Sequence, residues 1–350
     1  MLIIGHETVR GLLAGREREL IGLVADAYRR HDEGLSALPH SVFLRFPDQP
    51  RNRIIGLPGF LGGADPVAGL KWIASYPGNI DSGRERASAS IILNSLETGY
   101  PQAFIEGSLI SAQRTAASAA LGARLLSGDR TPTGVALIGC GVINREILRF
   151  LMADNPKLTA VTVYDSDPAR AEAFAAILQG RAPSYAKSDN KVPFLADVAV
   201  AGGVGEAVGA HELVSIATTA AAPHMDLAAS RPGAVVLHVS LRDLTTATIL
   251  ASHNVVDDPD HVLRERTSPH LAQEETGRRD FIDASIGALL RGTATLRPEP
   301  GRPLVYSPFG LGVLDLALAR YVHDEAARRG LGTTVDDFLP PSANPVEESR

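Results

Sequence analysis

Three basic residues occupy positions where a solvent-exposed charge is unexpected. Arg45 lies inside an apolar, strand-like run, Lys71 begins a second apolar run, and Arg114 lies three residues into a helix if Ser111 is its N-cap. The positive end of the helix dipole disfavours a cation in that first turn. Cations placed in this way are suited to binding an anion such as a carboxylate. The alternative is structural: Arg45 and Lys71 extend to solvent, and Arg114 pairs with an acid such as Glu106.

A glycine-containing turn after a short apolar run indicates a dinucleotide site. Gly139 and Gly141 allow a tight turn and let the backbone approach a pyrophosphate at the helix N-terminus. Asn144 stands where this fingerprint has its third glycine, so the match is incomplete. We assign Val142, Ile143 and Asn144, in the first turn of the helix, to the same cofactor site. The alternative is an ordinary tight turn.

An acidic residue after the next strand supports the dinucleotide interpretation. Asp165 follows Asn144 by 21 residues, and a carboxylate at this place can accept the ribose hydroxyls and repel a 2′-phosphate. The cofactor expected is therefore NAD rather than NADP. Thr218, which follows a later strand, is assigned to the cofactor site as well. Alternatively, Asp165 only opens the helix cap that contains Asp167. We assign no metal ligands.

The elements that position these residues change in pattern near residue 131. Before it we expect two short helices within 6–31, strand-like runs and an Ala-rich helix, at 41–47, 53–58, 87–96, 102–105 and 108–126. After it strands and helices alternate, at 135–138, 144–152, 160–164, 168–178, 213–217, 234–239 and 254–256, before a last helix at 310–329. Alternation of this kind predicts an α/β fold with a parallel sheet covered on both faces.

Composition excludes several classes of protein. The chain has 350 residues, of which 45% are hydrophobic and 21% charged, as expected of a folded globular protein with two domains. Its net charge of −6 and the lack of a basic run argue against nucleic acid as a partner. The single cysteine, Cys140, allows no disulfide within the chain. Without a signal peptide or an apolar stretch of membrane-spanning length, we expect a cytoplasmic protein.

Blocks around the basic residues resemble the ornithine cyclodeaminase/μ-crystallin family. These blocks are Lys71-Trp72 with Tyr76-Pro77-Gly78-Asn79, Ile91-Ile92-Leu93-Asn94, Glu97-Thr98-Gly99, and Arg114-Thr115-Ala116-Ala117-Ser118-Ala119. The resemblance implies a homodimer with its active site in the cleft between two domains. It also implies that Arg45, Lys71 and Arg114 hold the carboxylate of an amino-acid substrate beside the nicotinamide.

The same resemblance implies the domain boundaries. A substrate-binding and dimerisation domain of the α/β type is expected over residues 1–130, and a Rossmann NAD-binding domain over 131–303. A segment over 304–339 carries the C-terminal helix back to the first domain, and 340–350 is expected to be a disordered tail.

Further blocks resemble one branch of this family more narrowly. They are Ile54-Ile55-Gly56-Leu57-Pro58, Leu61-Gly62-Gly63, Arg86-Ala87-Ser88-Ala89, Glu106-Gly107-Ser108, Ser240-Leu241-Arg242-Asp243 and Ser307-Pro308-Phe309-Gly310-Leu311-Gly312. Enzymes of that branch use NAD to oxidise N-(2-amino-2-carboxyethyl)-L-glutamate, and hydrolysis then gives L-2,3-diaminopropionate and 2-oxoglutarate for siderophore or other secondary-metabolite biosynthesis. The resemblance implies this reaction.

One loop departs from the cyclodeaminase pattern. Cyclodeaminases carry a catalytic Asp in a Gly-x-Asp-x-Pro-Gly loop, whereas this chain has Ser240-Leu241-Arg242-Asp243-Leu244. Lys71 and Asp243 are our candidates for acid–base catalysis, and Arg242 for an additional substrate carboxylate. His238 and His270 are better explained as structural. The remaining alternatives are a cyclodeaminase-type lyase, a simple amino-acid dehydrogenase, and a non-catalytic nucleotide-binding protein.

Overall fold

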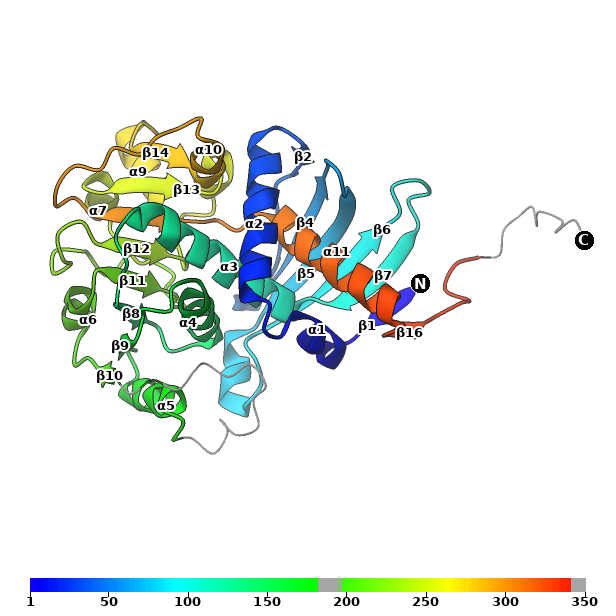
Figure 1. Cartoon of the computed structure of the whole chain (residues 1–350), viewed down its shortest axis with the longest axis horizontal. Helices are drawn as coiled ribbons and strands as arrows, with labels where there is room; N and C mark the ends of the chain where they lie inside the picture. The colour runs from blue at the N-terminus through cyan, green and yellow to red at the C-terminus, as the bar shows by residue number, and fades with distance from the viewer. Residues whose placement is uncertain (182–194, 196, 341–350) are drawn as a thin grey trace, which may run out of the picture.

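The computed structural model describes residues 1–181, 195 and 197–340. Within them the chain forms two eight-stranded sheets, which lie on either side of helix α2 (Glu17–Asp32) in Figure 1. The α/β class expected from the sequence is confirmed. Apart from Pro340, the expected tail lies outside the described residues. No helix in the described part of the chain is long and apolar enough to cross a membrane.

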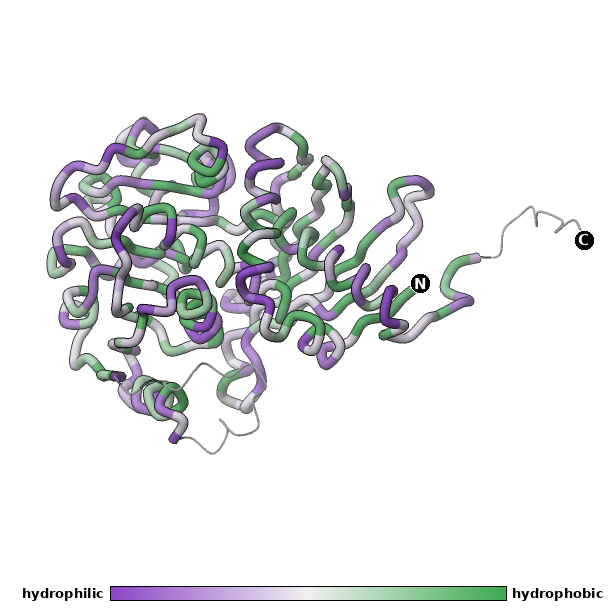
Figure 2. Tube along the Cα trace, in the orientation of Figure 1, coloured by the Kyte–Doolittle hydropathy of each residue, from purple (hydrophilic) through white to green (hydrophobic). Residues whose placement is uncertain are grey.

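The first sheet is made mainly of N-terminal strands and runs in the order β16-β1-β7-β6-β5-β4-β2, with β3 also paired to β4. Its strands are β1 (Leu2–Ile4), β2 (Ser36–Ala37), β3 (Val42–Phe46), β4 (Gln49–Leu61), β5 (Val67–Ser75), β6 (Ala87–Asn94), β7 (Pro101–Glu106) and β16 (Thr333–Thr334). All pairs are antiparallel except β1 with β7. The tip of the β6–β7 hairpin is hydrophilic (Figure 2).

Side-chain alternation in this sheet decides which residues are buried. Lys71 on β5 faces α11 (Gly312–Arg329), the helix that packs on β4, β5 and β6. The Lys71 side chain is therefore buried, and the residue is 1% exposed. Its neighbour Trp72 points to the opposite face and is 43% exposed. Lys71 is therefore a core residue of the first sheet.

The second sheet is entirely parallel, in the order β10-β9-β8-β11-β12-β15-β13-β14. Its strands are β8 (Gly134–Ile138), β9 (Ala160–Tyr164), β10 (Asp197–Val200), β11 (Leu213–Ile216), β12 (Val235–His238), β13 (His253–Val256), β14 (Ile282–Ser285) and β15 (Leu304–Ser307). Every residue of its central strands β8, β11, β12, β15 and β13 is buried, as expected where helices cover both faces. The order reverses between β8 and β11, which is where a doubly wound sheet binds its ligand.

One domain boundary and one conditional helix cap need correction. Residues 304–307 were expected to begin the returning segment, but they form β15 inside the second sheet. We therefore propose that the second domain extends through Ser307. The helix α3 (Ser108–Ser127) begins before Ser111, because Glu106 accepts the backbone N–H of Ser108 at 2.7 Å and so satisfies the start of the helix. Arg114 consequently lies in the second turn.

The remaining helices cover the sheets and join them. They are α1 (His6–Leu13), the 3-10 helix η1 (Pro77–Ser82), α4 (Val142–Asp154), α5 (Pro168–Leu178), α6 (Val204–Ala210), α7 (Thr246–Leu250), α8 (Pro259–Val262), α9 (Ser268–Thr276) and α10 (Ile286–Arg291). Asp167 caps α5 with Pro168 in its first turn, as the sequence predicts.

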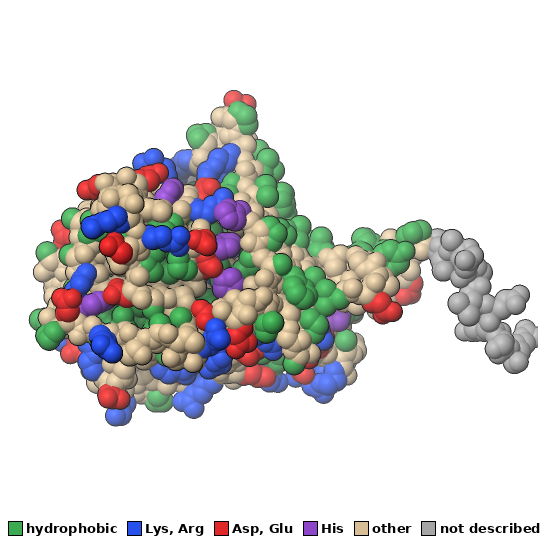
Figure 3. Space-filling model, turned by 90° about the horizontal axis from the view of Figure 1, so that it is seen from above, with side chains coloured by type: hydrophobic (Ala, Val, Ile, Leu, Met, Phe, Trp, Pro, Cys, Tyr) green, Lys and Arg blue, Asp and Glu red, His purple; other side chains and the backbone are tan. Residues whose placement is uncertain are grey.

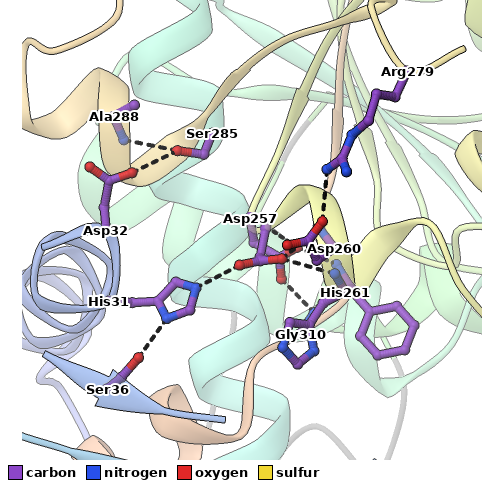
Figure 4. Close-up of polar contacts among 12 residues, drawn as sticks. His31, Asp32, Ser36, Asp257, Asp260, His261, Arg279, Ser285, Ala288 and Gly310 are labelled. Atoms are coloured by element: carbon purple, nitrogen blue, oxygen red, sulfur yellow. Dashed lines mark hydrogen bonds and ion pairs between the residues drawn. The ribbon is translucent and has the colours of Figure 1, made fainter. Parts of the chain in front are cut away.

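The C-terminal end of α2 connects the two sheets through polar contacts (Figure 4). His31 bonds to Asp258 at 2.9 Å and to Ser36 at 2.7 Å, while Asp32 accepts from Ser285 at 3.0 Å. Burial alone would raise the pKa of Asp258, but the bonds from His31 and the backbone N–H of His261 lower it to about 2. This corner holds the second sheet against α2 and thereby fixes its position relative to the first sheet.

Candidate active site

Strand β5, helix α3 and helix α11 bring two of the predicted cations onto one carboxylate. Lys71 Nζ donates to Asp315 Oδ2 at 2.6 Å, and Arg114 Nε donates to Asp315 Oδ1 at 3.0 Å. Lys71 Nζ also donates to Ser111 Oγ at 3.2 Å. The proposed extension of Lys71 to solvent is therefore wrong, and the partner of Arg114 is Asp315 rather than Glu106.

In this buried cluster two cations share one directly bound carboxylate, and Asp257 acts electrostatically on Arg114 from further away. Burial and the charge of Arg114 lower the pKa of Lys71, while Asp315 partly opposes them. The net result is a pKa of about 8. Burial would raise the pKa of Asp315, but Arg114 and Lys71 lower it, so this carboxylate stays ionised. Arg114 binds Asp315 through Nε, so its two terminal nitrogens can still donate to an anionic ligand. Lys71 also has a pKa suited to proton transfer near neutral pH.

A tight turn holds the guanidinium of Arg114 in place. Gly310 has a φ of +93°, and a Cβ added to it would lie 2.7 Å from Arg114 Nη1, so only glycine fits here. Asp257, at the end of β13, accepts the backbone N–H groups of Phe309 at 2.9 Å and Gly310 at 2.7 Å (Figure 4). Arg114 therefore lies against a turn that is anchored to the carboxyl edge of the second sheet.

Asp243 is enclosed by hydrogen-bond donors. Thr218 and Ser240 donate their hydroxyls to its carboxylate, and His238 Nε2 lies 3.4 Å from Oδ2. Burial would raise the pKa of Asp243, but His238, Ser240 and Thr218 lower it. Leu241, two residues before, has a φ of 68°, a strained value for a bulky residue and one typical of functional loops. Asp243 is thus a stable anion that orients Thr218, and a weak base.

The structure groups Arg45 with Arg242 and separates both from Lys71. Arg45 Nη2 lies 2.8 Å from Glu265 Oε2, and Arg242 Nη2 donates to the backbone oxygen of Glu265 at 2.8 Å. The side chain of Arg45 is 57% exposed. The three cations predicted to act together therefore divide into a buried pair, Lys71 with Arg114, and a more open group around Glu265.

The glycine loop has the geometry that a dinucleotide requires. Gly139 has a φ of +95°, and an added Cβ would lie 2.4 Å from the oxygen of Ala217. Gly141 is the N-cap of α4, and no described atom would lie within 4 Å of a Cβ built on it. Val142 is exposed and Ile143 half-buried, in the first turn of a helix without a side-chain cap. This open helix N-terminus fits a pyrophosphate.

Asn144 and Asp165 fix the shape of that loop. Asn144 is fully buried, donates to the oxygens of Ile138 at 2.9 Å and Gly139 at 2.7 Å, and accepts from Ser215 at 2.7 Å. It thus supports the loop from within the protein. Asp165 Oδ2 accepts the N–H of Cys140 at 2.8 Å, which places its carboxylate beside the glycine turn. This is where a ribose acceptor is needed.

Sequence reasoning missed Asp315 and Glu265, which pair with the predicted cations. An available signal for Asp315 was a carboxylate within the apolar run Gly312-Val313-Leu314-Asp315-Leu316 of the C-terminal helix. Its partners are 244 and 201 residues away in the chain, so no local pattern identifies them. Glu265 lies in a loop and carries no comparable signal.

Comparison with known proteins finds one family whose model matches most of the chain. The family model of the Ornithine cyclodeaminase/mu-crystallin family matches residues 7–330. N-((2S)-2-amino-2-carboxyethyl)-L-glutamate dehydrogenase of Staphylococcus aureus is 27% identical over 344 residues, which cover 96% of this chain and 98% of that protein.

Two solved structures share the fold. Thermococcus litoralis Delta(1)-pyrroline-2-carboxylate reductase, in complex with NADH and L-proline, has a TM-score of 0.84 at 24% identity, covering 96% of this chain and 100% of that one. An archaeal alanine dehydrogenase dimer with bound NAD has a TM-score of 0.82 at 23% identity, covering 97% and 99%.

Proposed function

The chain belongs to the ornithine cyclodeaminase/mu-crystallin family, and we propose that it is an NAD-dependent dehydrogenase of N-(2-amino-2-carboxyethyl)-L-glutamate. The products are L-2,3-diaminopropionate and 2-oxoglutarate. The observation that carries the proposal is the buried cluster of Lys71, Arg114 and Asp315, in which the terminal nitrogens of Arg114 can bind a substrate carboxylate. The similarity to the Staphylococcus aureus dehydrogenase over nearly the whole chain supports this substrate.

We propose that the glycine loop holds the NAD pyrophosphate against the N-terminus of α4, with Asp165 accepting the ribose hydroxyls. Bound NAD supplies the acceptor for the hydride that leaves the substrate carbon. Thr218, oriented by Asp243, lies at the carboxyl edge of the same sheet, after β11.

The chain's own groups have two tasks in this reaction. Arg114 binds the substrate carboxylate and so orients the carbon that is oxidised. Neutral Lys71 accepts the proton of the protonated secondary amine, because hydride loss requires an unprotonated nitrogen. The resulting iminium ion takes up water, and cleavage of the carbon–nitrogen bond leaves a ketone and a primary ammonium ion. A pKa of about 8 lets Lys71 perform this transfer near neutral pH.

We also propose that the chain forms a homodimer through the uncovered face of the first sheet. Register places Trp72, Phe104 and Ile3 on this face, and they are 43%, 40% and 37% exposed. Figure 3 shows hydrophobic side chains gathered on the right-hand flank of the molecule, the side on which the first sheet lies in Figure 1. A contiguous apolar face of this kind marks an interface. The archaeal alanine dehydrogenase noted above is a dimer.

The activity is tested by incubating the protein with NAD and N-(2-amino-2-carboxyethyl)-L-glutamate. Reduced nicotinamide, followed by absorbance, and 2-oxoglutarate and diaminopropionate, quantified by mass spectrometry, should form in equal amounts. Alanine, proline and ornithine serve as competing substrates. Lys71→Gln should remove activity while NAD still binds, whereas Lys157→Gln, at an exposed lysine, should not. Faster oxidation of alanine, or proline formation from ornithine, would replace this proposal with another activity of the family.

A further inference from the structure

Four arginines gather where the Glu265 loop meets the first sheet. We call them the arginine cluster: Arg45 on β3, Arg53 on β4, Arg86 before β6, and Arg242 in the loop after β12. Arg53 pairs with Arg45 in the strand register and interacts electrostatically with Arg86 and Arg242. Arg53 is therefore the centre of the cluster.

The arginine cluster has more positive than negative charge. Glu265 is the carboxylate bound directly, through Arg45, and Glu85 and Asp243 act only at a distance, on Arg86 and Arg242 respectively. The guanidinium of Arg53 makes no hydrogen bond or salt bridge with any described residue. Arg86 donates only to a neutral group, Ser75 Oγ, at 2.7 Å. Arginines without a directly bound carboxylate can donate hydrogen bonds to an anionic ligand.

The environment of these arginines already penalises their charge. Burial lowers the pKa of Arg53, and repulsion from Arg45 lowers it further. Burial and the charge of Arg53 also lower the pKa values of Arg86 and Arg242. A bound carboxylate would relieve this repulsion and receive bidentate hydrogen bonds.

The cluster lies on the same face of the first sheet as Lys71. Lys71 and Ser75 are four residues apart on β5, so their side chains share a face, and Ser75 is paired with Arg53 in the register. Four residues of strand correspond to roughly 13 Å. An extended substrate with a carboxylate at each end can therefore contact Arg114 at one end and the arginine cluster at the other.

The loops that complete the cluster have a fixed backbone. In the described residues, the non-glycine positions with positive φ are Leu241, Glu265 and Arg266, at 68°, 54° and 53°. Leu241 adjoins Arg242, Glu265 carries the carbonyl that Arg242 binds, and Arg266 is the next residue in the chain. Strained residues persist only where the surroundings hold them, and they concentrate at binding sites.

We propose that the arginine cluster binds the distal carboxylate of the substrate and so selects dicarboxylic over monocarboxylic amino-acid substrates. The inference rests on the proposed function, because it assumes that the first carboxylate is held by Lys71 and Arg114. It assigns specificity to Arg53 and Arg86, and it gives Arg45 and Arg242 a ligand distinct from the one bound at the buried cluster.

The test compares two ligands that differ only at the far end. 2-Oxoglutarate and 2-oxopentanoate are titrated calorimetrically into the wild-type protein, with and without NAD, and into Arg53→Gln and Arg297→Gln. Arg297 is an exposed arginine in the loop before β15. Arg297→Gln is the control, because it removes the same positive charge as Arg53→Gln. The wild type and Arg297→Gln should bind 2-oxoglutarate at least tenfold more tightly than 2-oxopentanoate. Arg53→Gln should lose most of this preference.

Two further measurements exclude a merely structural role. Because Arg53 is repelled by its neighbours, Arg53→Gln should unfold at the same or a higher temperature than the wild type without ligand. With N-(2-amino-2-carboxyethyl)-L-glutamate it should raise KM at least tenfold with a smaller change in kcat. A wild type without preference for 2-oxoglutarate, or a preference that survives in Arg53→Gln, overturns the inference. A preference lost in Arg53→Gln, in a protein that does not oxidise this substrate, supports the inference and rejects the proposed function.

Discussion

Replacing Asp315 by Asn tests how the buried cluster works. The substitution keeps the shape of the side chain and removes its charge, so Lys71 and Arg114 are left without a carboxylate. Asp315 is 0% exposed, and neither solvent nor a described neighbour replaces it. Removing one partner of a buried ion pair typically costs about 3–5 kcal/mol of unfolding free energy. We expect Asp315→Asn to lose an amount in this range, measured by urea unfolding at neutral pH.

The same substitution should move the pH profile of the reaction. Burial lowers the pKa of Lys71 to about 8 even though Asp315 raises it, so loss of Asp315 must lower it further. An opposite charge at this distance shifts a pKa by about 1–3 units. If neutral Lys71 accepts the substrate proton, kcat/KM rises with pH through the pKa of Lys71. This limb should appear near pH 8 in the wild type and at lower pH in Asp315→Asn.

The chain supplies a matched control on the same helix. Asp324 is half-exposed and binds Arg320 at 2.6 Å, one helical turn away. Such surface pairs are worth about 0.5 kcal/mol or less. Asp324→Asn should therefore leave both stability and pH profile almost unchanged. Equal behaviour of the two variants in both assays would refute the assignment of Asp315 as the counter-ion of the catalytic lysine.

Three further variants test other parts of the molecule. Asp165→Ser should reduce the preference for NAD over NADP by about 1.5–3 kcal/mol, the value of charge-assisted hydrogen bonds, as measured by fluorescence titration; an unchanged ratio would remove Asp165 from the ribose site. In the folded protein the pKa of Asp258 is depressed to about 2, so its stabilising contribution is present above the unfolded value of about 3.9 and is lost as pH falls toward 2. Asp258→Asn should thus be less stable than the wild type at pH 6, with the difference shrinking below pH 4 in urea unfolding; a constant difference contradicts the His31–Asp258 contact. Trp72→Arg should give monomers in light scattering, and an intact dimer would place the interface elsewhere.

Local sequence signals predicted those parts of the fold that depend on local structure. The glycine turn at Gly139, the Asp167 cap of α5 and the β6–β7 hairpin all follow from residues within a few positions of one another. β15 was missed because its short run, Leu304–Ser307, is a strand only through its position between β12 and β13. The start of α3 was predicted at residue 108, but the alternative cap at Ser111 was wrong, because Glu106 binds the first N–H groups of the helix.

The candidate site was only partly predictable, because its residues come together through contacts between distant parts of the chain. Lys71 and Arg114 could be singled out because a charge is unusual in their local context. Their common partner Asp315 comes from the other end of the chain, so the net charge of the cluster became known only from the structure. The position of Arg45 relative to Lys71 depends on strand register, which the run of residues around Arg45 does not contain.

The structure also distinguishes between the two acid–base candidates, of which the sequence put Lys71 before Asp243. The carboxylate of Asp243 already accepts hydrogen bonds from Thr218 and Ser240 and lies beside His238, and these neighbours lower its pKa. It is ionised throughout the neutral range, but its proton affinity is too low for an efficient base. Burial acts in the opposite sense on Lys71, because it favours the neutral amine and brings the pKa to about 8. The stabilised anion of Asp243 therefore orients Thr218, while Lys71, whose charged form is destabilised by burial, is the group suited to exchange a proton with the substrate.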